Sequence, residues 1–136
     1  MQGRVTWVNE LTFVGEAGSG NSVVMEGGRK NNGIRPMEMI LLGVGGCASY
    51  DVVNILQKAR QDIISCHCEL NGERPDATPS PFTRIEMAFV VRGRNLKEAQ
   101  VARAVELSAD KYCSASIMLR NAGVEIVHSY RVENAE

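Results

Sequence analysis

One apolar segment that contains three glycines, Met39–Ala48, constrains the fold of this chain more than any other feature. Pro36 suits the first turn of a helix, and no further proline follows before Arg60, so the sequence predicts a helix from Met37 to about Arg60. A helical segment that is apolar on every side is tolerated only when other protein surrounds it. Each internal glycine costs up to about 1 kcal/mol relative to alanine, which a close approach of another backbone or a ligand would offset. We therefore expect this helix at the centre of the fold.

Alternation between apolar and polar residues predicts strands on both sides of this helix. Glycine-rich turns separate the first three strands and indicate an antiparallel meander, and Pro75–Pro81 joins the fourth and fifth strands as a hairpin. The residues of the fourth strand expected to face the core are Ile64, Cys66, Cys68 and Leu70. The predicted strands are Arg4–Val8, Leu11–Gly15, Ser22–Met25, Ile63–Leu70, Phe82–Arg92 and Val124–Val132.

Two further helices are expected between the last two strands. Asn95 and Glu98 resemble a capping box that opens a helix from Leu96 to about Lys111. A shorter helix follows over residues 114–123, with Ser114 as its cap and Gly123 as its stop, so Cys113 would lie beside a helix N-terminus. The fold class is therefore α+β, and 136 residues fit a single domain over residues 1–136.

The balance of charge and hydrophobicity limits the partners. Fifteen Lys and Arg residues face sixteen Asp and Glu residues, the net charge is −1, and no run of basic residues offers a stripe for phosphates. We therefore expect no nucleic acid partner. The N-terminus lacks the apolar stretch of a signal peptide, and no segment approaches the roughly 20 apolar residues that cross a bilayer. A cytoplasmic protein without membrane contact is the expectation.

Four cysteines in a reducing compartment read as core thiols, metal ligands or redox-active groups. Cys66 and Cys68 are most simply small core residues of a strand. A zinc site built on these two and His67 would need the histidine on the same face, whereas a strand places it on the opposite one. A cysteine protease would need an oriented histidine, and neither His67 nor His128 shows such a pattern. We expect no metal and no bound cofactor.

Cys47 and Cys113 are the candidates for chemistry. Cys47 directly follows the glycines of the central helix, where a thiol can have an open approach. Cys113 beside a helix N-terminus would feel the positive end of the helix dipole, which lowers a thiol pKa. For each of them the plain alternative is a buried structural thiol.

The run Arg35–Cys47, together with Cys113 in the segment Lys111-Tyr112-Cys113-Ser114, resembles the superfamily of osmotically inducible protein C (OsmC) and the organic hydroperoxide resistance proteins. The strand order agrees along essentially the whole chain, and the Pro-Met-Glu at residues 36–38 resembles a poorly characterised branch of that superfamily. The resemblance implies antiparallel sheets around a long central helix. It also implies an intertwined homodimer, with two central helices packed together and two sites at the subunit interface.

In the peroxidatic members of the superfamily, a first cysteine attacks the peroxide and becomes a sulfenic acid. A second cysteine then condenses with it to a disulfide, which a dithiol reductant opens. The resemblance assigns the first role to Cys47 and the second to Cys113. These members also carry a glutamate directly after the helix-start proline, where it supports an arginine that activates the first cysteine. This chain has Met37 at that position and Glu38 one residue later, rotated by about 100° on a helix.

Arg29 and Arg35 are the candidates for the activating arginine, and Ser114 follows the second cysteine where a proline is common. The leading hypothesis is a thiol-dependent hydroperoxide reductase with Cys47 as attacking thiolate and Cys113 as resolving thiol. The alternative is a non-peroxidatic protein of the same fold that binds a small apolar or electrophilic ligand at the dimer interface. A third reading is a structural or interaction protein whose cysteines are all core residues.

Overall fold

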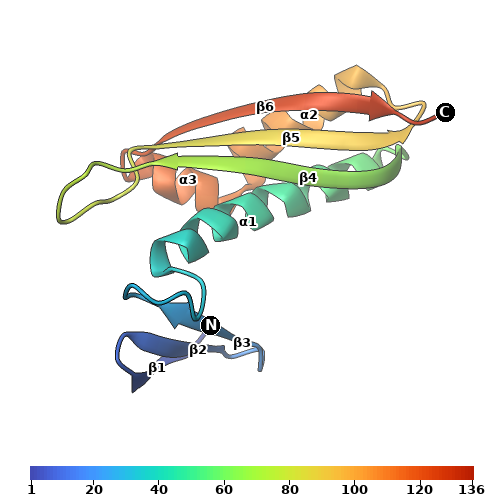
Figure 1. Cartoon of the computed structure of the whole chain (residues 1–136). Coiled ribbons are helices and arrows are strands. Elements are labelled where there is room, and N and C mark those ends of the chain that lie inside the picture. Colours follow the sequence, from blue (N-terminus) through green and yellow to red (C-terminus); the bar gives the residue numbers. More distant parts are fainter. The chain divides into compact units, whose positions relative to one another are not determined.

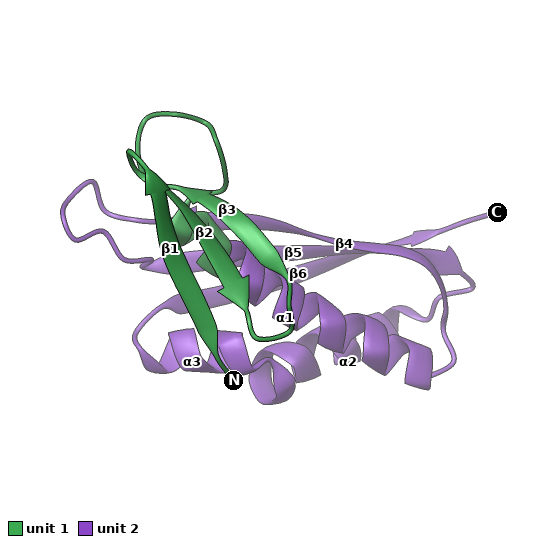
Figure 2. Cartoon of the chain, turned by 90° about the horizontal axis from the view of Figure 1, so that it is seen from below, with its two compact units in different colours: residues 1–40 green, residues 41–136 purple.

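The structure is a computed structural model that describes residues 1–136. It contains two compact units, residues 1–40 and residues 41–136, which Figure 2 colours green and purple. Each unit is described by itself, and the single domain expected over residues 1–136 stays a prediction.

The first unit holds an antiparallel three-stranded sheet, β1 (Gly3–Asn9), β2 (Thr12–Ala17) and β3 (Ser22–Glu26), in the order β1-β2-β3 (Figure 1). This confirms the predicted meander. The carboxylate of the buried Glu26 accepts hydrogen bonds from the Thr12 hydroxyl at 2.8 Å and the Gly28 N–H at 2.6 Å. These bonds hold the pKa of Glu26 below its usual range.

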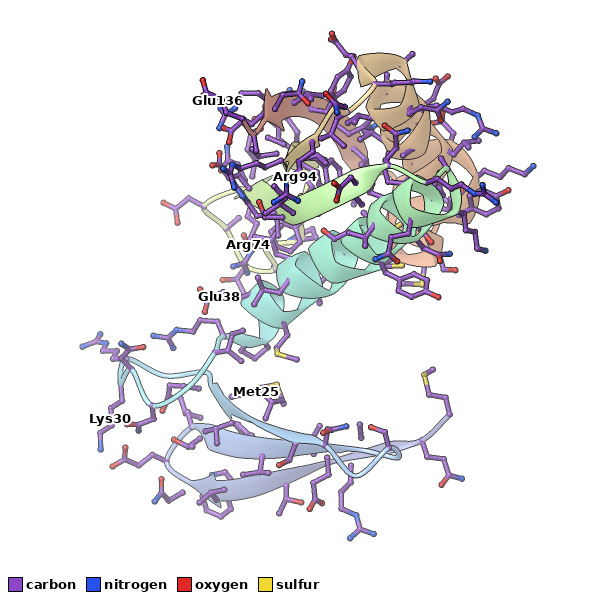
Figure 3. All side chains as sticks on the ribbon, turned by 90° about the vertical axis from the view of Figure 1, so that its right-hand side faces the viewer. Met25, Lys30, Glu38, Arg74, Arg94 and Glu136 are labelled. Atoms are coloured by element: carbon purple, nitrogen blue, oxygen red, sulfur yellow. The ribbon has the colours of Figure 1, made fainter.

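The helix α1 (Pro36–Lys58) confirms the central helix expected from the sequence. Its N-terminus carries half of a capping box, because the Glu38 carboxylate accepts the Arg35 N–H at 2.8 Å (Figure 3). The Arg35 guanidinium donates to the backbone carbonyls of Glu26, at 3.1 Å, and Gly28. Both side chains are therefore engaged in fixing the start of α1.

Length and composition alone make the 23-residue α1 apolar enough to cross a bilayer, which corrects the expectation that no segment reaches that limit. Core helices of soluble proteins meet the same criterion. Here α1 buries Val44, Ala48, Val52 and Leu56, one face of the helix, in the core of the second unit. The absence of membrane contact stays a prediction.

The second unit holds a sheet of β4 (Asp62–Glu73), β5 (Arg84–Arg94) and β6 (Glu125–Asn134), in the order β4-β5-β6 (Figure 1). The α+β class is confirmed. The pair β4 and β5 is the predicted antiparallel hairpin, whereas β6 runs parallel to β5, so this sheet is mixed and not purely antiparallel. A parallel pair needs a long crossover, which the helices between β5 and β6 supply. The inward residues of β5 are Ile85, Met87, Phe89 and Val91, as the alternation predicted.

The predicted inward face of β4 is correct except at its start. A bulge between Ile63 and Ser65 shifts the alternation by one residue. Ile63 consequently packs against the core, and the predicted Ile64 is 40% exposed. Cys66 and Cys68 do pack against the core.

The crossover consists of α2 (Glu98–Leu107), the π-helical turn η1 (Ser108–Tyr112) and α3 (Ser114–Asn121). The capping box predicted at Asn95 is wrong: α2 starts after Lys97 without a side-chain cap, and Asn95 has a φ of 52°. The cap of α3 is Cys113 and not the predicted Ser114, since the Cys113 side chain accepts the Ser116 N–H. The sequence pattern predicted that these two helices exist. It placed the start of each one or more residues away from its position in the structure.

Candidate functional site

Cys47 and Cys113, the two candidate cysteines, come together in the second unit, and a third residue joins them. The two sulfur atoms and a carboxylate oxygen of Asp51 all lie within 4.8 Å of one another. Cys47 and Asp51 stand four residues apart on α1 and so share one face of the helix. Cys113 is brought to that face by the turn between η1 and α3. We refer to these three residues as the thiol cluster.

The sulfur of Cys113 is fully buried and held in place by α3. It accepts hydrogen bonds from the N–H of Ser116 at 3.4 Å and from the hydroxyl of the same residue at 3.0 Å, and the Cys113 N–H donates to the Ser108 carbonyl at 2.8 Å. Burial raises the pKa of Cys113 more than these bonds from Ser116 lower it, and the neighbouring Cys47 raises it further. The lowered pKa expected from the helix dipole is therefore wrong, because desolvation outweighs the favourable dipole.

Asp51 is half-buried and is positioned through Ser108. The Ser108 hydroxyl lies 3.1 Å from the Ala48 carbonyl and 3.5 Å from the Asp51 carboxylate, so one buried hydroxyl links α1 to η1. Burial raises the pKa of Asp51, opposed by the hydrogen bond from Ser108. Sequence reasoning missed this residue, although its four-residue spacing from Cys47 on a predicted helix was a visible signal.

Cys47 itself is half-buried and packs at the edge of the core. Of the helix glycines, Gly45 is required by packing, because a Cβ there would lie 2.6 Å from the Leu70 side chain of β4. A Cβ at Gly43 or Gly46 would meet nothing within 4 Å. The predicted close approach therefore occurs at Gly45 alone within the single chain, and the group that approaches is the Leu70 side chain and not a backbone or a ligand.

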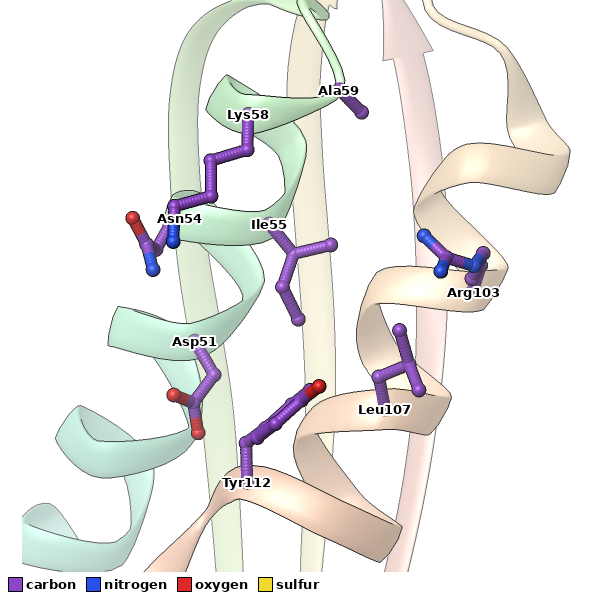
Figure 4. Close-up of a pocket in the computed structure, with 8 residues that line it drawn as sticks. All are labelled: Asp51, Asn54, Ile55, Lys58, Ala59, Arg103, Leu107 and Tyr112. Atoms are coloured by element: carbon purple, nitrogen blue, oxygen red, sulfur yellow. The ribbon is translucent and has the colours of Figure 1, made fainter.

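A cavity of about 470 Å³ opens beside the thiol cluster, with Asp51 in its wall (Figure 4). Its walls come from α1, α2 and η1, all in the second unit. The lining residues are Asp51, Asn54, Ile55, Lys58, Ala59, Arg103, Leu107 and Tyr112.

The thiol cluster is also the one group of side chains in the structure that converges as metal ligands do. Two thiolates and a carboxylate belong to the donor set that zinc accepts. The Cys113 sulfur, however, already accepts two hydrogen bonds from Ser116. The expectation of no metal stays a prediction.

The remaining two cysteines lie in a different environment. Cys66 and Cys68 lie on the core face of β4, and burial raises the pKa of both thiols, that of Cys68 to about 11 with further contributions from Cys66 and Glu69. His67 is exposed on the other face, 3.6 Å from Glu69. The two cysteines and His67 thus lie on opposite faces of β4, as the alternation predicted.

Comparison with known proteins agrees with this geometry. Residues 28–129 match the family described as OsmC-like protein, which is more than half of the chain. The chain belongs to the OsmC-like family. The superfamily inferred from the residues around Cys47 and Cys113 is thus confirmed.

Among relatives of this OsmC-like chain, protein YhfA of Escherichia coli K12 is 52% identical over 132 residues, covering 97% of this chain and 98% of YhfA. A hypothetical protein from Aquifex aeolicus has a similar structure, with a TM-score of 0.88, 28% identity and coverage of 99% of this chain and 97% of that one. An organic hydroperoxide resistance protein from Elizabethkingia anophelis shares the fold at a TM-score of 0.72 and 13% identity, covering 98% and 94% of the two chains.

Proposed function

We propose that this protein is a thiol-dependent hydroperoxide reductase in which Cys47 attacks the peroxide and Cys113 resolves the product. The approach of the two sulfur atoms to within 4.8 Å carries the proposal. A disulfide needs its sulfurs about 2 Å apart, so the proposal requires the two side chains to move closer together when the bond forms. Family membership and the fold shared with a hydroperoxide resistance protein support the same chemistry.

The unequal burial of the two cysteines supports the proposed order of reaction. Cys47 is half-buried and can be reached by a small peroxide, whereas Cys113 is 0% exposed. A buried thiol with a raised pKa is a poor first nucleophile but is protected from peroxide until its partner has reacted. Cys47 is therefore the first to react and Cys113 the second.

The reaction has two steps. In the first, the Cys47 thiolate attacks one peroxide oxygen, the O–O bond breaks, and the other oxygen leaves as an alcohol after taking a proton, so that Cys47 becomes a sulfenic acid. In the second, the Cys113 thiolate attacks the Cys47 sulfur and the hydroxyl leaves as water, which forms the disulfide. A dithiol reductant then exchanges with the disulfide and restores both thiols.

Asp51 is the group in the thiol cluster that can carry the protons. Each step removes a proton from a thiol and delivers one to a leaving oxygen, and a carboxyl group within 4.8 Å of both sulfurs can do both, directly or through one water. Two of the residues considered for the activating role, Arg35 and Glu38, are instead engaged at the start of α1.

We also propose a cytoplasmic homodimer. Proteins of this family are generally homodimers. The face of α1 opposite the core leaves Leu42 and Tyr50 53% and 70% exposed, and the open glycines Gly43 and Gly46 lie on the same helix. A second copy packed on this face would cover the apolar side chains and explain the open glycines. Sedimentation equilibrium should give twice the mass of one chain, and a monomer at micromolar concentration would contradict the dimer.

The first test of the reaction is the intact mass of the reduced protein after one equivalent of an organic hydroperoxide, with peptide mapping of any new bond. We expect a loss of two hydrogens and a disulfide between Cys47 and Cys113. The Cys66→Ser variant is the matched control and should form the same bond. No oxidation at Cys47 would overturn the proposal.

A second candidate is a non-peroxidatic protein that binds a small electrophilic ligand near Cys47. Met37 at the position of the supporting glutamate favours it, and Glu38, one residue later, is engaged with the Arg35 N–H at the start of α1. Saturable binding of such a ligand without any peroxide turnover would select this function.

A further inference from the structure

Ser116 is a fully buried residue of α3 whose hydroxyl has a single hydrogen-bond partner, the sulfur of Cys113. The hydroxyl oxygen lies 3.0 Å from that sulfur and the Ser116 nitrogen lies 3.4 Å from it, and both residues are 0% exposed. A serine hydroxyl inside a helix can donate instead to a carbonyl of the preceding turn. Here it donates to the sulfur. Two donors of one residue therefore converge on Cys113.

These two donors match a thiolate better than a thiol. A buried hydroxyl has given up its hydrogen bonds to water, and a neutral thiol sulfur is only a weak acceptor in their place. A hydrogen bond to an ionised acceptor is about twice as strong as one between neutral groups. The donors of Ser116 thus stabilise Cys113 most after it has lost its proton. That ionised form is the one that attacks another sulfur.

The other surroundings of the Cys113 sulfur oppose its ionisation. The titratable groups beside it are Cys47 and Asp51, both on α1, and the core around it is apolar. Burial raises the pKa of Cys113 and Cys47 raises it further, whereas the two bonds from Ser116 lower it. The remaining titratable residues of η1 and α3 are Asp110, Lys111 and Tyr112, which are exposed, and Arg120, which donates to the Ala109 carbonyl. Ser116 is thus the residue that counteracts desolvation of the thiolate.

We propose that Ser116 is a positioning residue for the resolving step and thereby protects Cys47 from irreversible oxidation. This inference rests on the proposed function and concerns the regulation of the same site. By stabilising the Cys113 thiolate within 4.8 Å of the Cys47 sulfur, Ser116 speeds the attack that forms the disulfide. In the competing reaction, a second hydroperoxide transfers one oxygen to the Cys47 sulfenic acid and leaves as an alcohol, which produces a sulfinic acid. Ser116 therefore sets the hydroperoxide concentration that the protein tolerates.

The test follows the two steps separately in a single turnover, by rapid quenching and mass spectrometry. In Ser116→Ala we expect oxidation of Cys47 within about twofold of wild type and disulfide formation slowed by about tenfold or more, the effect of losing a hydrogen bond to a charged group. The rate of disulfide formation should also rise with pH at a higher midpoint than in wild type, because the thiolate has lost a donor.

Repeated turnover gives a second readout of the same variant. The sulfenic acid is divided between disulfide and sulfinic acid according to the ratio of the two rates. In Ser116→Ala, the sulfinic acid at Cys47, a gain of two oxygen atoms, should therefore appear at about a tenfold lower hydroperoxide concentration than in wild type. An unchanged concentration would contradict the protective role.

Ser114→Ala is the matched control, because Ser114 is an exposed serine in the first turn of the same helix. It should behave as wild type in both steps. Ser116→Thr keeps the hydroxyl and should restore most of the rate of disulfide formation. A merely structural role of Ser116 would lower the melting temperature and slow both steps alike, with no shift of the pH midpoint. Either that pattern or equal rates of disulfide formation in Ser116→Ala and wild type would overturn the proposal.

A further measurement uses no peroxide. In a chain whose other three cysteines are replaced by serine, the Cβ chemical shift of isotopically labelled Cys113 reports its pKa, which Ser116→Ala should raise. Coinciding titrations would overturn the proposal and leave the reductase intact. Failure of the reductase is a different result, in which hydroperoxide leaves Cys47 of wild type reduced. The protective role of Ser116 would then fall with it, whatever the titration shows.

Discussion

Two pairs of neighbouring thiols occur in this chain, and they differ in what surrounds them. Cys66 and Cys68 lie two residues apart on β4 and pack against apolar side chains of the core. Cys47 and Cys113 come from distant segments and meet beside a carboxylate. Burial raises the pKa of both thiols of the strand pair and also that of Cys113, where two hydrogen bonds from Ser116 oppose the rise.

The comparison teaches that proximity of thiols alone does not make a redox site. The strand pair has no carboxyl group positioned to exchange protons, and its neighbours are those of an ordinary core. The thiol cluster has one accessible sulfur, one buried sulfur and Asp51 between α1 and η1. Polar neighbours and unequal exposure thus distinguish the pair that we propose to react from the pair that packs in the core.

The largest effect is expected from Cys47→Ser. It should reduce hydroperoxide consumption to the uncatalysed level and abolish disulfide formation, because the attacking sulfur is lost. Cys66→Ser should leave consumption within about twofold of wild type. A stopped-flow peroxide assay measures both, and equal losses in the two variants would erase the distinction between the pairs.

The second-largest effect is expected in the alkylation rate of Cys68, which together with Cys66 forms the strand pair. With a pKa of about 11, roughly one Cys68 in ten thousand is a thiolate at pH 7, about a hundredfold less than for an ordinary cysteine. Cys68 should therefore label with iodoacetamide at least about a hundredfold more slowly than the cysteine of an unstructured peptide. Quantitative peptide mass spectrometry over time measures the two rates, and labelling of Cys68 should accelerate about tenfold per pH unit below its pKa. Comparable rates at pH 7 would contradict the assignment.

Asp51→Asn should lower peroxide turnover by about a hundredfold, the usual contribution of general acid–base catalysis, and remove the rise of the rate with pH through the ionisation of Asp51. The same substitution should increase stability where it decreases activity. Burial raises the pKa of Asp51 in the folded state, so wild type loses stability as the pH rises from the unfolded pKa through the folded pKa.

Asp51→Asn does not lose stability in this way, because asparagine does not ionise. As the pH rises from about 3 to about 7, a range that begins below the unfolded pKa of an aspartate, the melting temperature of Asp51→Asn should therefore gain on that of wild type, as differential scanning calorimetry can measure. A variant that is both less active and less stable at pH 8 would indicate a structural role for Asp51 and would remove the main difference between the two thiol pairs.

The smallest effect is expected where α1 approaches the strand that carries the second pair. Gly45→Ala should destabilise the protein by about 1–2 kcal/mol, because the new methyl group would lie 2.6 Å from the Leu70 side chain. Gly46→Ala meets open space in the single chain and should gain up to about 1 kcal/mol of helix stability. Urea unfolding at low protein concentration compares the two. If Gly46→Ala is the more damaging variant, a second copy lies against that face.

Most of the fold could be predicted from the local periodicity of apolar residues. The six strands, the three helices and the position of Cys47 after a run of helix glycines all follow from patterns that repeat every two or 3.6 residues. Helix starts were predicted less well, since no side chain caps α2 at the expected Asn95, whereas Glu38 supplies half of a capping box at the start of α1. A four-residue motif is short enough to occur by chance, and only the backbone conformation decides which copy caps a helix.

The sequence by itself determined the class of this protein, its family and the two cysteines most suited to chemistry. Only the tertiary structure decided that Asp51 joins them, that burial raises the pKa of Cys113, and that a cavity opens beside Asp51 with Lys58 and Arg103 in its wall. The physical reason is the range of each effect. Periodicity acts between residues close in the chain, whereas desolvation and the meeting of side chains depend on every neighbour that packing brings from elsewhere.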